Sequence, residues 1–397
     1  MSLAESYAGR SVFVTGHTGF KGAWLTEWLG TLGAEVTGYA LDPATQPNLF
    51  EALDLVSRVR HLVADVRASD RLLAEVQAAQ PSVIFHLAAQ AIVRRAYAEP
   101  RETFETNVMG TVNVLEAARA CPSVRAVVIV TSDKCYQNHE TDRAFRETDA
   151  MGGRDPYSAS KGCAELVTAA YRESFFADVG EDVDADGVAA AAGADVDVGA
   201  DVGAGGAAVA SARAGNVIGG GDWAEDRIIP DSARALAAGA PIIVRNPDAI
   251  RPWQHVLEPL SGYLQLGALL LRDGRHYQGA WNFGPTNQGG DRSVRWVVEQ
   301  FLGEWGSGTW STPSDAARQP HEAHRLSLDS AKAREQLGWA PVWDAQTAVR
   351  QTANWYREYY RAPATARELV EDQLRAYQAE ARAAGLPWAG AAGVTTT

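Results

Sequence analysis

The stretch SVFVTGHTGFKGAWLTEWLG, residues 11–30, decides the fold. Its first five residues are largely apolar and β-branched, which predicts a buried strand over Ser11–Thr15. The glycine-rich turn Gly16–Gly22 follows, and Ala23–Leu32 has the composition of a helix. Glycines at this spacing permit a tight turn and a close backbone approach to a pyrophosphate, whose charge the amides at the helix start then hold. The strand–turn–helix order therefore predicts a dinucleotide site at the start of the chain.

The alternation of strands and helices continues beyond this unit. Further strands are predicted over Glu35–Ala40, Val83–Leu87, Ala126–Val130 and Val209–Arg213, and helices over Leu72–Ala79, Thr103–Ala120 and Tyr157–Phe175. The strands are apolar throughout rather than alternating, which is typical of a parallel sheet covered by helices on both faces. We therefore predict a doubly wound parallel α/β sheet of the Rossmann type, with a smaller C-terminal lobe that binds the substrate.

The composition along the chain suggests how it is divided. We expect a dinucleotide-binding domain over residues 1–176 with returning segments near 208–220 and 253–285, a flexible acidic insertion over 177–208, a mainly substrate-binding lobe over 209–360, and a C-terminal helix with a frayed tail over 361–397. The insertion consists almost only of Ala, Gly, Asp and Val, which cannot bury much apolar surface. Its spaced aspartates look like the start of a calcium loop, but Gly193 stands where such a loop needs a Glu, so no metal site is predicted.

Charge and hydropathy exclude several classes of protein. The formal net charge is -13, which disfavours a nonspecific binder of nucleic acid or of a membrane surface. Much of the acidic excess lies between Ala177 and Ala212, so the remaining surface can still hold a basic pocket. The chain has no apolar stretch of roughly 18 residues and no signal-peptide pattern at its start. Cys121, Cys135 and Cys163 form no CxxC pair and suit a reducing compartment, so we expect a cytoplasmic protein.

An acidic residue after the second predicted strand indicates the cofactor. Asp42 lies about twenty residues beyond the last glycine of the turn, where an acid binds the adenosine ribose in NAD-type sites. No Arg stands beside it to receive a 2′-phosphate, which favours NAD over NADP. The competing interpretation is that Asp42 only caps a turn before Pro43. Asp65 and Val66 follow the next apolar stretch and are expected to approach the adenine.

Two polar clusters carry the candidate chemistry. Thr131-Ser132-Asp133-Lys134 follows a predicted strand, and Tyr157 and Lys161 lie four residues apart on one helix face. Active sites of open α/β sheets lie beyond the carboxyl ends of the strands. An ammonium and a positive nicotinamide near Tyr157 would lower the pKa of its phenol and make it a general base for an alcohol. Lysine is scarce in this chain, and its occurrence twice here argues against an ordinary surface pair.

Together these motifs resemble the extended short-chain dehydrogenase/reductase family of nucleotide-sugar enzymes, and within it the CDP-glucose branch of the 4,6-dehydratases. The resemblance runs from about Ser11 to about Trp355, apart from the insertion. It rests on the glycine turn, LAA at 87–89, NVMGT at 107–111, TSDKCYQN, DPYSASKGCAELV, RAGNVIGGGDWAEDR, IRPWQHVLEPLSGY, HEAH at 321–324 and LGW at 337–339. It implies NAD contacts at Gly16, Thr18, Gly19, Phe20, Lys21, Gly22, Asp42, Asp65, Val66, Leu87, Ala88, Ala89, Asn107, Tyr157 and Lys161. It also implies a homodimer, or a tetramer, built through the helices over 103–120 and 157–175.

The resemblance implies an internal redox reaction with defined roles. Tyr157 would take the proton of the sugar's 4-hydroxyl while hydride leaves carbon 4, Thr131 would hydrogen-bond that hydroxyl, and Lys161 would hold the ribose. Asp133 would protonate the departing 6-hydroxyl before hydride returns to carbon 6. Lys134 stands where related enzymes carry a Glu as the carbon 5 base. An ammonium cannot accept a proton, so Lys134 must either act in its neutral form or stabilise the enolate while another group takes the proton.

Three residues within the quoted motifs are candidates for binding the substrate. Asn216 and Arg251 match the family's pyrophosphate contacts, and the planar fork of Arg suits phosphate. His324 is expected near the nucleotide. The alternatives are a 4,6-dehydratase or 4-epimerase for a dTDP, UDP or GDP sugar, and a non-catalytic dinucleotide-binding sensor. A sensor needs only the glycine turn, so the joint presence of Thr131, Asp133, Tyr157 and Lys161 argues against it.

Overall fold

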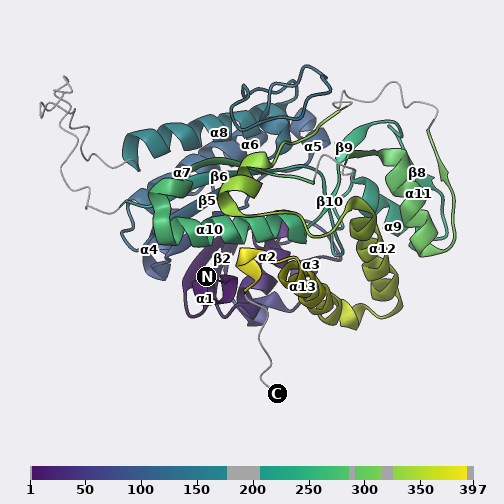
Figure 1. Cartoon of the computed structure of the whole chain (residues 1–397), viewed down its shortest axis with the longest axis horizontal. Coiled ribbons are helices and arrows are strands. Elements are labelled where there is room, and N and C mark those ends of the chain that lie inside the picture. Colours follow the sequence, from purple (N-terminus) through teal and green to yellow (C-terminus); the bar gives the residue numbers. More distant parts are fainter. Residues whose placement is uncertain (1, 177–205, 286–290, 314–324, 391–397) are drawn as a thin grey trace, which may run out of the picture.

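The computed structural model describes residues 2–176, 206–285, 291–313 and 325–390. A seven-stranded sheet in the order β11-β6-β5-β4-β1-β2-β3 lies at its centre (Figure 1). Every neighbouring pair in this sheet is parallel, which confirms the predicted fold class. The strands are β1 Ser11–Thr15, β2 Glu35–Ala40, β3 Arg60–Val63, β4 Val83–His86, β5 Ala126–Val130, β6 Ala208–Ala214 and β11 Gly279–Phe283.

Helices cover both faces of the sheet because its strands are apolar on both sides. In β1, Val12 and Val14 pack with α2 and α10, whereas Phe13 packs with α4 and α7. The helices of the sheet domain are α1 Leu3–Tyr7, α2 Phe20–Thr31, α3 Leu49–Ala52, α4 Ser69–Ala79, α5 Val93–Ala98, α6 Pro100–Phe104, α7 Gly110–Arg119, α8 Pro156–Phe175 and α10 Leu257–Tyr277. Successive side chains of a strand therefore point into two different hydrophobic cores, one on each face of the sheet, and neither set points into water.

The strand order creates a crevice at one end of the sheet. From β1 the chain proceeds outward to β2 and β3, and then returns to β4, β5, β6 and β11 on the other side. The loops after β1 and β4 therefore diverge at the carboxyl ends of the strands, where open α/β sheets bind their ligands. β6 and β11 fall within the segments 208–220 and 253–285, so the central sheet is completed by chain from far beyond residue 176.

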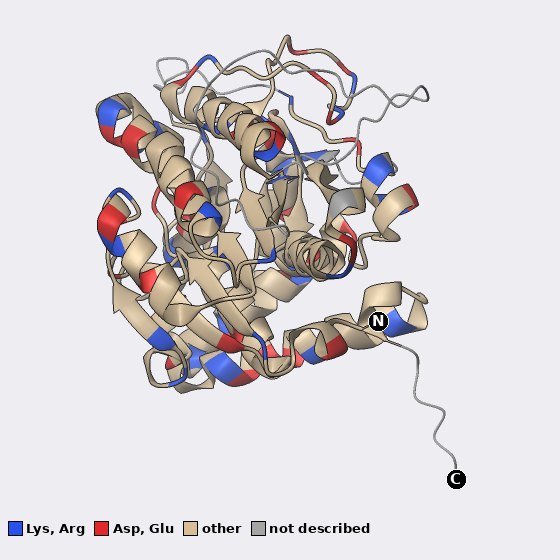
Figure 2. Cartoon of the chain, turned by 90° about the vertical axis from the view of Figure 1, so that its left-hand side faces the viewer, with Lys and Arg blue, Asp and Glu red and all other residues tan. Residues whose placement is uncertain are grey.

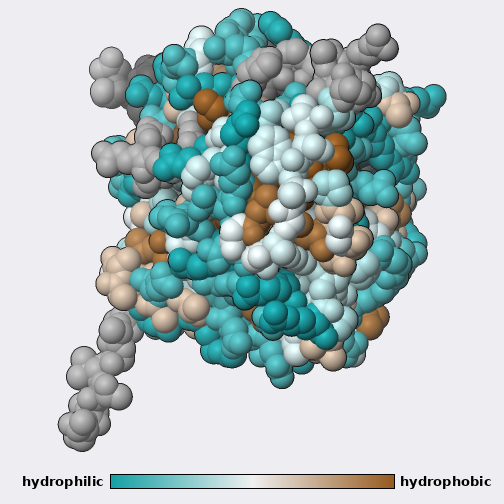
Figure 3. All heavy atoms as spheres, turned by 90° about the vertical axis from the view of Figure 1, so that its right-hand side faces the viewer, coloured by the Kyte–Doolittle hydropathy of each residue, from teal (hydrophilic) through white to brown (hydrophobic). Residues whose placement is uncertain are grey.

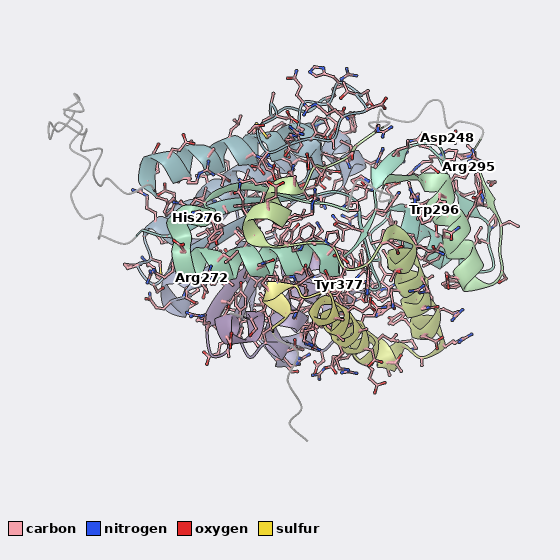
Figure 4. All side chains as sticks on the ribbon, viewed as in Figure 1. Asp248, Arg272, His276, Arg295, Trp296 and Tyr377 are labelled. Carbon is pink, nitrogen blue, oxygen red and sulfur yellow. The ribbon has the colours of Figure 1, made fainter. Side chains whose placement is uncertain are left out.

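A smaller set of elements stands beside the carboxyl ends of the strands (Figure 1). It comprises β7 Val217–Ile218, α9 Ile228–Ala237, β8 Ile242–Ile243, β9 Ile250–Pro252, β10 Gln254–His255, β12 Asp291–Ser293, α11 Val294–Trp305, β13 Trp310–Ser311 and α12 Ala345–Arg361. Figure 4 shows Asp248, Arg295 and Trp296 grouped at this end of the molecule, where the first two form an ion pair of 3.0 Å. The shortness of these strands explains why their sequence shows no clear periodicity.

The predicted helix over Thr103–Ala120 is interrupted. Between α6 and α7 the residues Glu105–Met109 form a π-helical turn. This turn brings Asn107 into the interior, where its Nδ2 donates to Gln90 O at 3.0 Å and to Ser160 Oγ at 2.8 Å. π-Helical turns often mark functional sites. Hydrophobic spacing cannot reveal such a turn, because it adds a single residue to an otherwise helical pattern.

The frayed tail predicted at the end of segment 361–397 does not include residues 386–390, which pack against the fold. Trp388 is only 3% exposed, and its ring lies 6.0 Å from that of Trp28 and 5.8 Å from that of Tyr377 on α13, Ala366–Ala383. One tryptophan buries enough area to anchor a segment that is otherwise composed of small residues. Figure 4 marks Tyr377 where α13 approaches the sheet domain. The last residues, 391–397, lie outside the described part of the chain, as do residues 177–205 of the acidic insertion.

Charged and hydrophobic residues are distributed differently over the molecule. In the view of Figure 2, acidic and basic residues are interspersed along the helices. On the opposite side, hydrophilic residues cover most of the face and hydrophobic ones show only in small areas (Figure 3). Within the described ranges, no helix combines the length and the hydrophobicity needed to span a bilayer.

Candidate active site

A cleft of about 620 Å³ opens at the carboxyl ends of the strands. Its walls bring together the glycine turn, the ends of β2, β4 and β5, the start of α8, and the elements that follow β6. Of the residues predicted for the site, those that line this cleft are Gly16, Thr18, Gly19, Phe20, Lys21, Gly22, Asp42, Asp65, Val66, Leu87, Ala88, Ala89, Thr131, Asp133, Lys134, Tyr157, Lys161, Asn216 and Arg251. Residues that are far apart in the sequence thus share one cavity.

The glycine turn leaves no room for side chains. Gly16 has a φ of +76°, and a Cβ on Gly22 would lie 2.1 Å from the Gly16 carbonyl oxygen. Helix α2 begins at Phe20, and its N-cap Gly19 offers no side-chain hydrogen bond. The first amides of α2 therefore remain available to an anion in the cleft, and the turn fits the pyrophosphate of a dinucleotide.

The predicted adenosine side of the cleft is formed by the ends of β2 and β3. Asp42 is exposed at the end of β2, and Thr18 fixes the neighbouring backbone by donating to Leu41 O at 2.9 Å. Asp65 accepts hydrogen bonds from Arg67, with Nε at 2.9 Å. Arg67 also lines the cleft, but its guanidinium is engaged by this carboxylate. Among the residues that the structure describes, no Lys or Arg forms a salt bridge with Asp42, which suits a carboxylate that would bind a ribose hydroxyl of NAD.

Of the predicted residues that the structure describes, Asn107 does not line the cleft. The side chain of Asn107 lies behind the wall, where it holds Gln90 and Ser160, and Gln90 lines the cleft in its place. The prediction of a direct cofactor contact by Asn107 is therefore not supported by its position, because both ends of its amide are already bonded. His324 lies outside the described residues.

The end of β5 and the start of α8 bring the catalytic candidates together. Ser132 Oγ donates to Asp133 Oδ1 at 3.0 Å and accepts from the Lys134 amide at 3.2 Å. Asp133 is buried, and within the described ranges its Oδ2 has no hydrogen-bond partner. Gly215 allows this close packing, because a Cβ there would lie 2.4 Å from Pro252 Cγ and 3.1 Å from Asp133 Oδ2. A buried carboxyl oxygen without a partner is suited to meet a substrate hydroxyl.

The electrostatics of Tyr157 differ from the prediction. Burial raises the pKa of Tyr157 to about 12, a hydrogen bond with the Ser132 side chain opposes this shift, and the charge on Arg227 opposes it further. Burial lowers the pKa of Lys161 to about 8, and its Nζ donates to Val130 O at 3.3 Å. In the chain alone, Ser132 and Arg227 rather than Lys161 thus favour the tyrosinate.

Comparison with known proteins identifies the family. Residues 13–179 match the family model described as GDP-mannose 4,6 dehydratase. The chain is 44% identical to the CDP-glucose 4,6-dehydratase of Salmonella typhimurium, over 89% of this chain and 92% of that protein. The chain belongs to the CDP-glucose 4,6-dehydratase family. It is therefore related to the NAD-dependent dehydratases and epimerases of nucleotide sugars, as the motifs predict.

Two solved structures show how far the fold of this dehydratase family extends. A dTDP-glucose 4,6-dehydratase from Bacillus anthracis in complex with NAD matches at a TM-score of 0.66 and 20% identity, over 87% of this chain and 96% of that one. A UDP-glucose 4-epimerase from Brucella ovis in complex with NAD matches at a TM-score of 0.69 and 20% identity, over 88% and 99% of the two chains. At this identity the likeness concerns the fold alone.

In this family member, the structure gives the predicted Thr131 hydroxyl another partner. That hydroxyl donates to Glu165 Oε1, a buried carboxylate on α8. The Ser132 side chain acts on the Tyr157 phenol, because it lowers the pKa of Tyr157 against the effect of burial. The signal was present in the sequence, because alternation along β5 places Val127, Ile129 and hence Thr131 on one face of the sheet and turns Ser132 to the other.

Two basic residues of the cleft have roles that the sequence did not predict: Arg227 was not a candidate, and Lys21 was a candidate for the cofactor turn alone. Arg227 precedes α9, lines the cleft and donates to Asp222 Oδ2 at 2.9 Å. Lys21 was assigned only to the cofactor turn, but its Nζ lies 6.0 Å from the ring centroid of Tyr263. Burial lowers the pKa of Lys21 to about 7, and the charge on Arg227 adds to this shift. Arg227 ends the motif RAGNVIGGGDWAEDR, but the motif does not tell which of its residues face the cleft, so only the fold reveals the position of Arg227.

Proposed function

We propose that this chain is a hydro-lyase that converts CDP-glucose to CDP-4-keto-6-deoxyglucose. The observation that carries the proposal is that Ser132, Asp133 and Lys134 meet Tyr157 and Lys161 in one cleft beside the glycine turn. The substrate follows from the relative at 44% identity. NAD, when bound in the cleft, supplies the hydride acceptor and later the hydride donor.

The first half of the reaction oxidises the sugar at carbon 4. Tyr157 takes the proton of the 4-hydroxyl as hydride leaves carbon 4. Ser132, rather than Thr131, is assigned to hold that hydroxyl, because the Ser132 side chain favours the tyrosinate form of Tyr157. Lys161, which lines the same cleft, would hold the cofactor ribose. The resulting 4-ketone makes the hydrogen on carbon 5 acidic.

The second half eliminates water across carbons 5 and 6. Asp133 in its protonated form donates a proton to the departing 6-hydroxyl, which leaves as water. Lys134 stands beside Asp133 at the cleft and stabilises the enolate as an ammonium, or takes the carbon 5 proton in its neutral form. Hydride would then return to carbon 6 while the proton is given back to carbon 5, so bound NAD would be regenerated. The diphosphate of the substrate is assigned to Asn216, Arg251 and Arg227, which line the far side of the cleft.

The substrate is tested by incubating the purified chain with CDP-glucose and, separately, with dTDP-glucose, UDP-glucose and GDP-mannose. Mass spectrometry is expected to show the loss of one water from the CDP sugar and none from the others. Water loss from another sugar alone would keep the chemistry and overturn the nucleotide. Epimerisation without water loss would favour the 4-epimerase, and intact sugars with NAD bound would favour the dinucleotide-binding sensor.

Two further assignments complete the proposal. The chain is proposed to form a homodimer through α6, α7 and α8, which correspond to the helices that the family resemblance implicates. Light scattering tests this, and a monomer at working concentration would contradict it. We also expect the reaction to take place in the cytoplasm, where the free thiols of Cys121, Cys135 and Cys163 remain reduced.

A further inference from the structure

A buried carboxylate lies directly behind the catalytic cluster. Glu165 is on α8, four residues after Lys161 and eight after Tyr157, so the three side chains share one face of the helix. Its Oε1 accepts a hydrogen bond from Thr131 Oγ1. Its Oε2 accepts from Ser211 Oγ and from Arg213 Nη2, each at 2.7 Å. One carboxylate thus joins the end of β5, strand β6 and α8.

The ion pair with Arg213 offsets the free-energy cost of burying the Glu165 carboxylate. Burial alone would raise the pKa of Glu165, but the Arg213 guanidinium and the hydrogen bonds outweigh it and hold that pKa below its usual value. Arg213 Nη1 donates to Tyr136 Oη at 2.7 Å, and Tyr136 Oη donates to Asn282 Oδ1 at 2.7 Å. The hydrogen-bond network that holds Glu165 therefore extends from Arg213 on β6 to Asn282 on β11. A carboxylate fixed from this side is a rigid acceptor for Thr131.

The consequence for the site follows from the position of Thr131 in the chain. Thr131 is held at its amide by Ala212 O at 2.9 Å and at its hydroxyl by Glu165. The next two residues, Ser132 and Asp133, line the cleft. With Thr131 fixed at two points, the backbone that carries both side chains cannot rotate freely against the helix that carries Tyr157.

We propose that Glu165 is a positioning residue of the dehydratase: through Thr131 it sets Ser132 and Asp133 against Tyr157 and Lys161. The inference rests on the proposed function. Glu165 does not reach the substrate, since Thr131 lies between it and the cleft. Glu165 also acts through its charge. Burial lowers the pKa of Lys161, and the negative charge of the Glu165 carboxylate raises it again in part.

The test is a double-mutant cycle of Thr131→Val and Glu165→Gln. Thr131→Val keeps the volume and removes the donor, and Thr131→Ser keeps the donor. We expect Thr131→Val and Glu165→Gln each to lower kcat by about ten- to a hundredfold with KM little changed, and Thr131→Ser to retain most activity. The double variant should be no slower than the slower single variant, because both break one link. Losses that multiply would show that Thr131 acts on the substrate independently, and would overturn the inference.

The pH profile supplies a readout that a purely structural role would not move. Without the Glu165 charge, Lys161 loses its proton at lower pH, so the alkaline limb of kcat/KM should shift to lower pH in Glu165→Gln. Thr168→Val is the matched control, because Thr168 is buried on the same helix and donates to Ala164 O at 2.7 Å. It should stay within about twofold of wild type.

The outcomes separate this inference from the proposed function. The cycle is measured on whichever nucleotide sugar the wild-type chain dehydrates, so inertness of CDP-glucose counts against the substrate and not against Glu165. An unshifted alkaline limb in Glu165→Gln would contradict the charge effect. Should Glu165→Gln fail to fold, Thr131→Val and Thr131→Ser leave the ion pair intact, and wild-type kcat in Thr131→Val would overturn the positioning role.

Discussion

Replacement of Tyr157 by phenylalanine is expected to lower kcat by about a thousandfold, the range of a lost general base. The change removes one oxygen from a buried ring and leaves the glycine turn, Asp42 and Lys161 in place. NAD content should therefore be unchanged. The loss should appear in kcat rather than in the KM for the nucleotide sugar, since the proton transfer takes place only in the transition state. Single-turnover kinetics and the cofactor content of the purified variant measure both.

Tyr171→Phe is the matched control for this substitution. Tyr171 lies on the same helix α8 but packs against α7, away from the cleft. Its replacement should change kcat by no more than about twofold. A Tyr157→Phe variant that keeps a tenth or more of wild-type kcat would show that another group takes the proton of the 4-hydroxyl.

Replacement of Asp133 by asparagine is expected to separate the two halves of the reaction. The amide has nearly the shape of the carboxyl group but cannot supply an acidic proton to the 6-hydroxyl. Water loss should fall by about a hundredfold or more. Oxidation at carbon 4 does not use this proton, so solvent deuterium should still enter carbon 5 of the recovered sugar. Mass spectrometry of the sugar in D₂O measures exchange and elimination in one sample.

Asp142→Asn serves as the control for charge and chemistry. Asp142 is exposed and pairs with Arg325 at 3.0 Å, outside the cleft. Its replacement should leave both exchange and water loss near wild type. If exchange at carbon 5 falls together with water loss in Asp133→Asn, then Asp133 serves an earlier step than protonation of the leaving group.

The fold was predictable because its signals are local. Apolar β-branched runs such as Ala126–Val130 form buried parallel strands wherever helices can cover both faces. The glycine turn is equally local, since the clash of any side chain at Gly22 with the Gly16 carbonyl follows from backbone geometry. β11 was missed because Gly279–Phe283 has no β-branched residue and contains Asn282, whose amide is satisfied by distant backbone carbonyls.

The site was predictable in its residue types but less so in their directions. Motif spacing indicates that 131–134 lie near Tyr157, but it does not tell which side chain faces the cleft. The direction depends on the alternation of side chains along β5, whose successive residues point to opposite faces of the sheet. Thr131 therefore contacts Glu165, whereas Ser132 acts on Tyr157. Arg227 ends a quoted motif, but it enters the cleft because α9 packs beside the strand ends, and that tertiary relation cannot be read from the motif.

The most direct measurement follows the hydrogen of carbon 4. CDP-glucose that carries deuterium at carbon 4 is incubated with the purified chain, and the position of the label in the product is read by NMR. Internal return of the hydride predicts a product that has lost one water and carries the deuterium at carbon 6, without net accumulation of NADH. Deuterium lost to the solvent or retained at carbon 4 of an epimer would contradict the dehydratase mechanism.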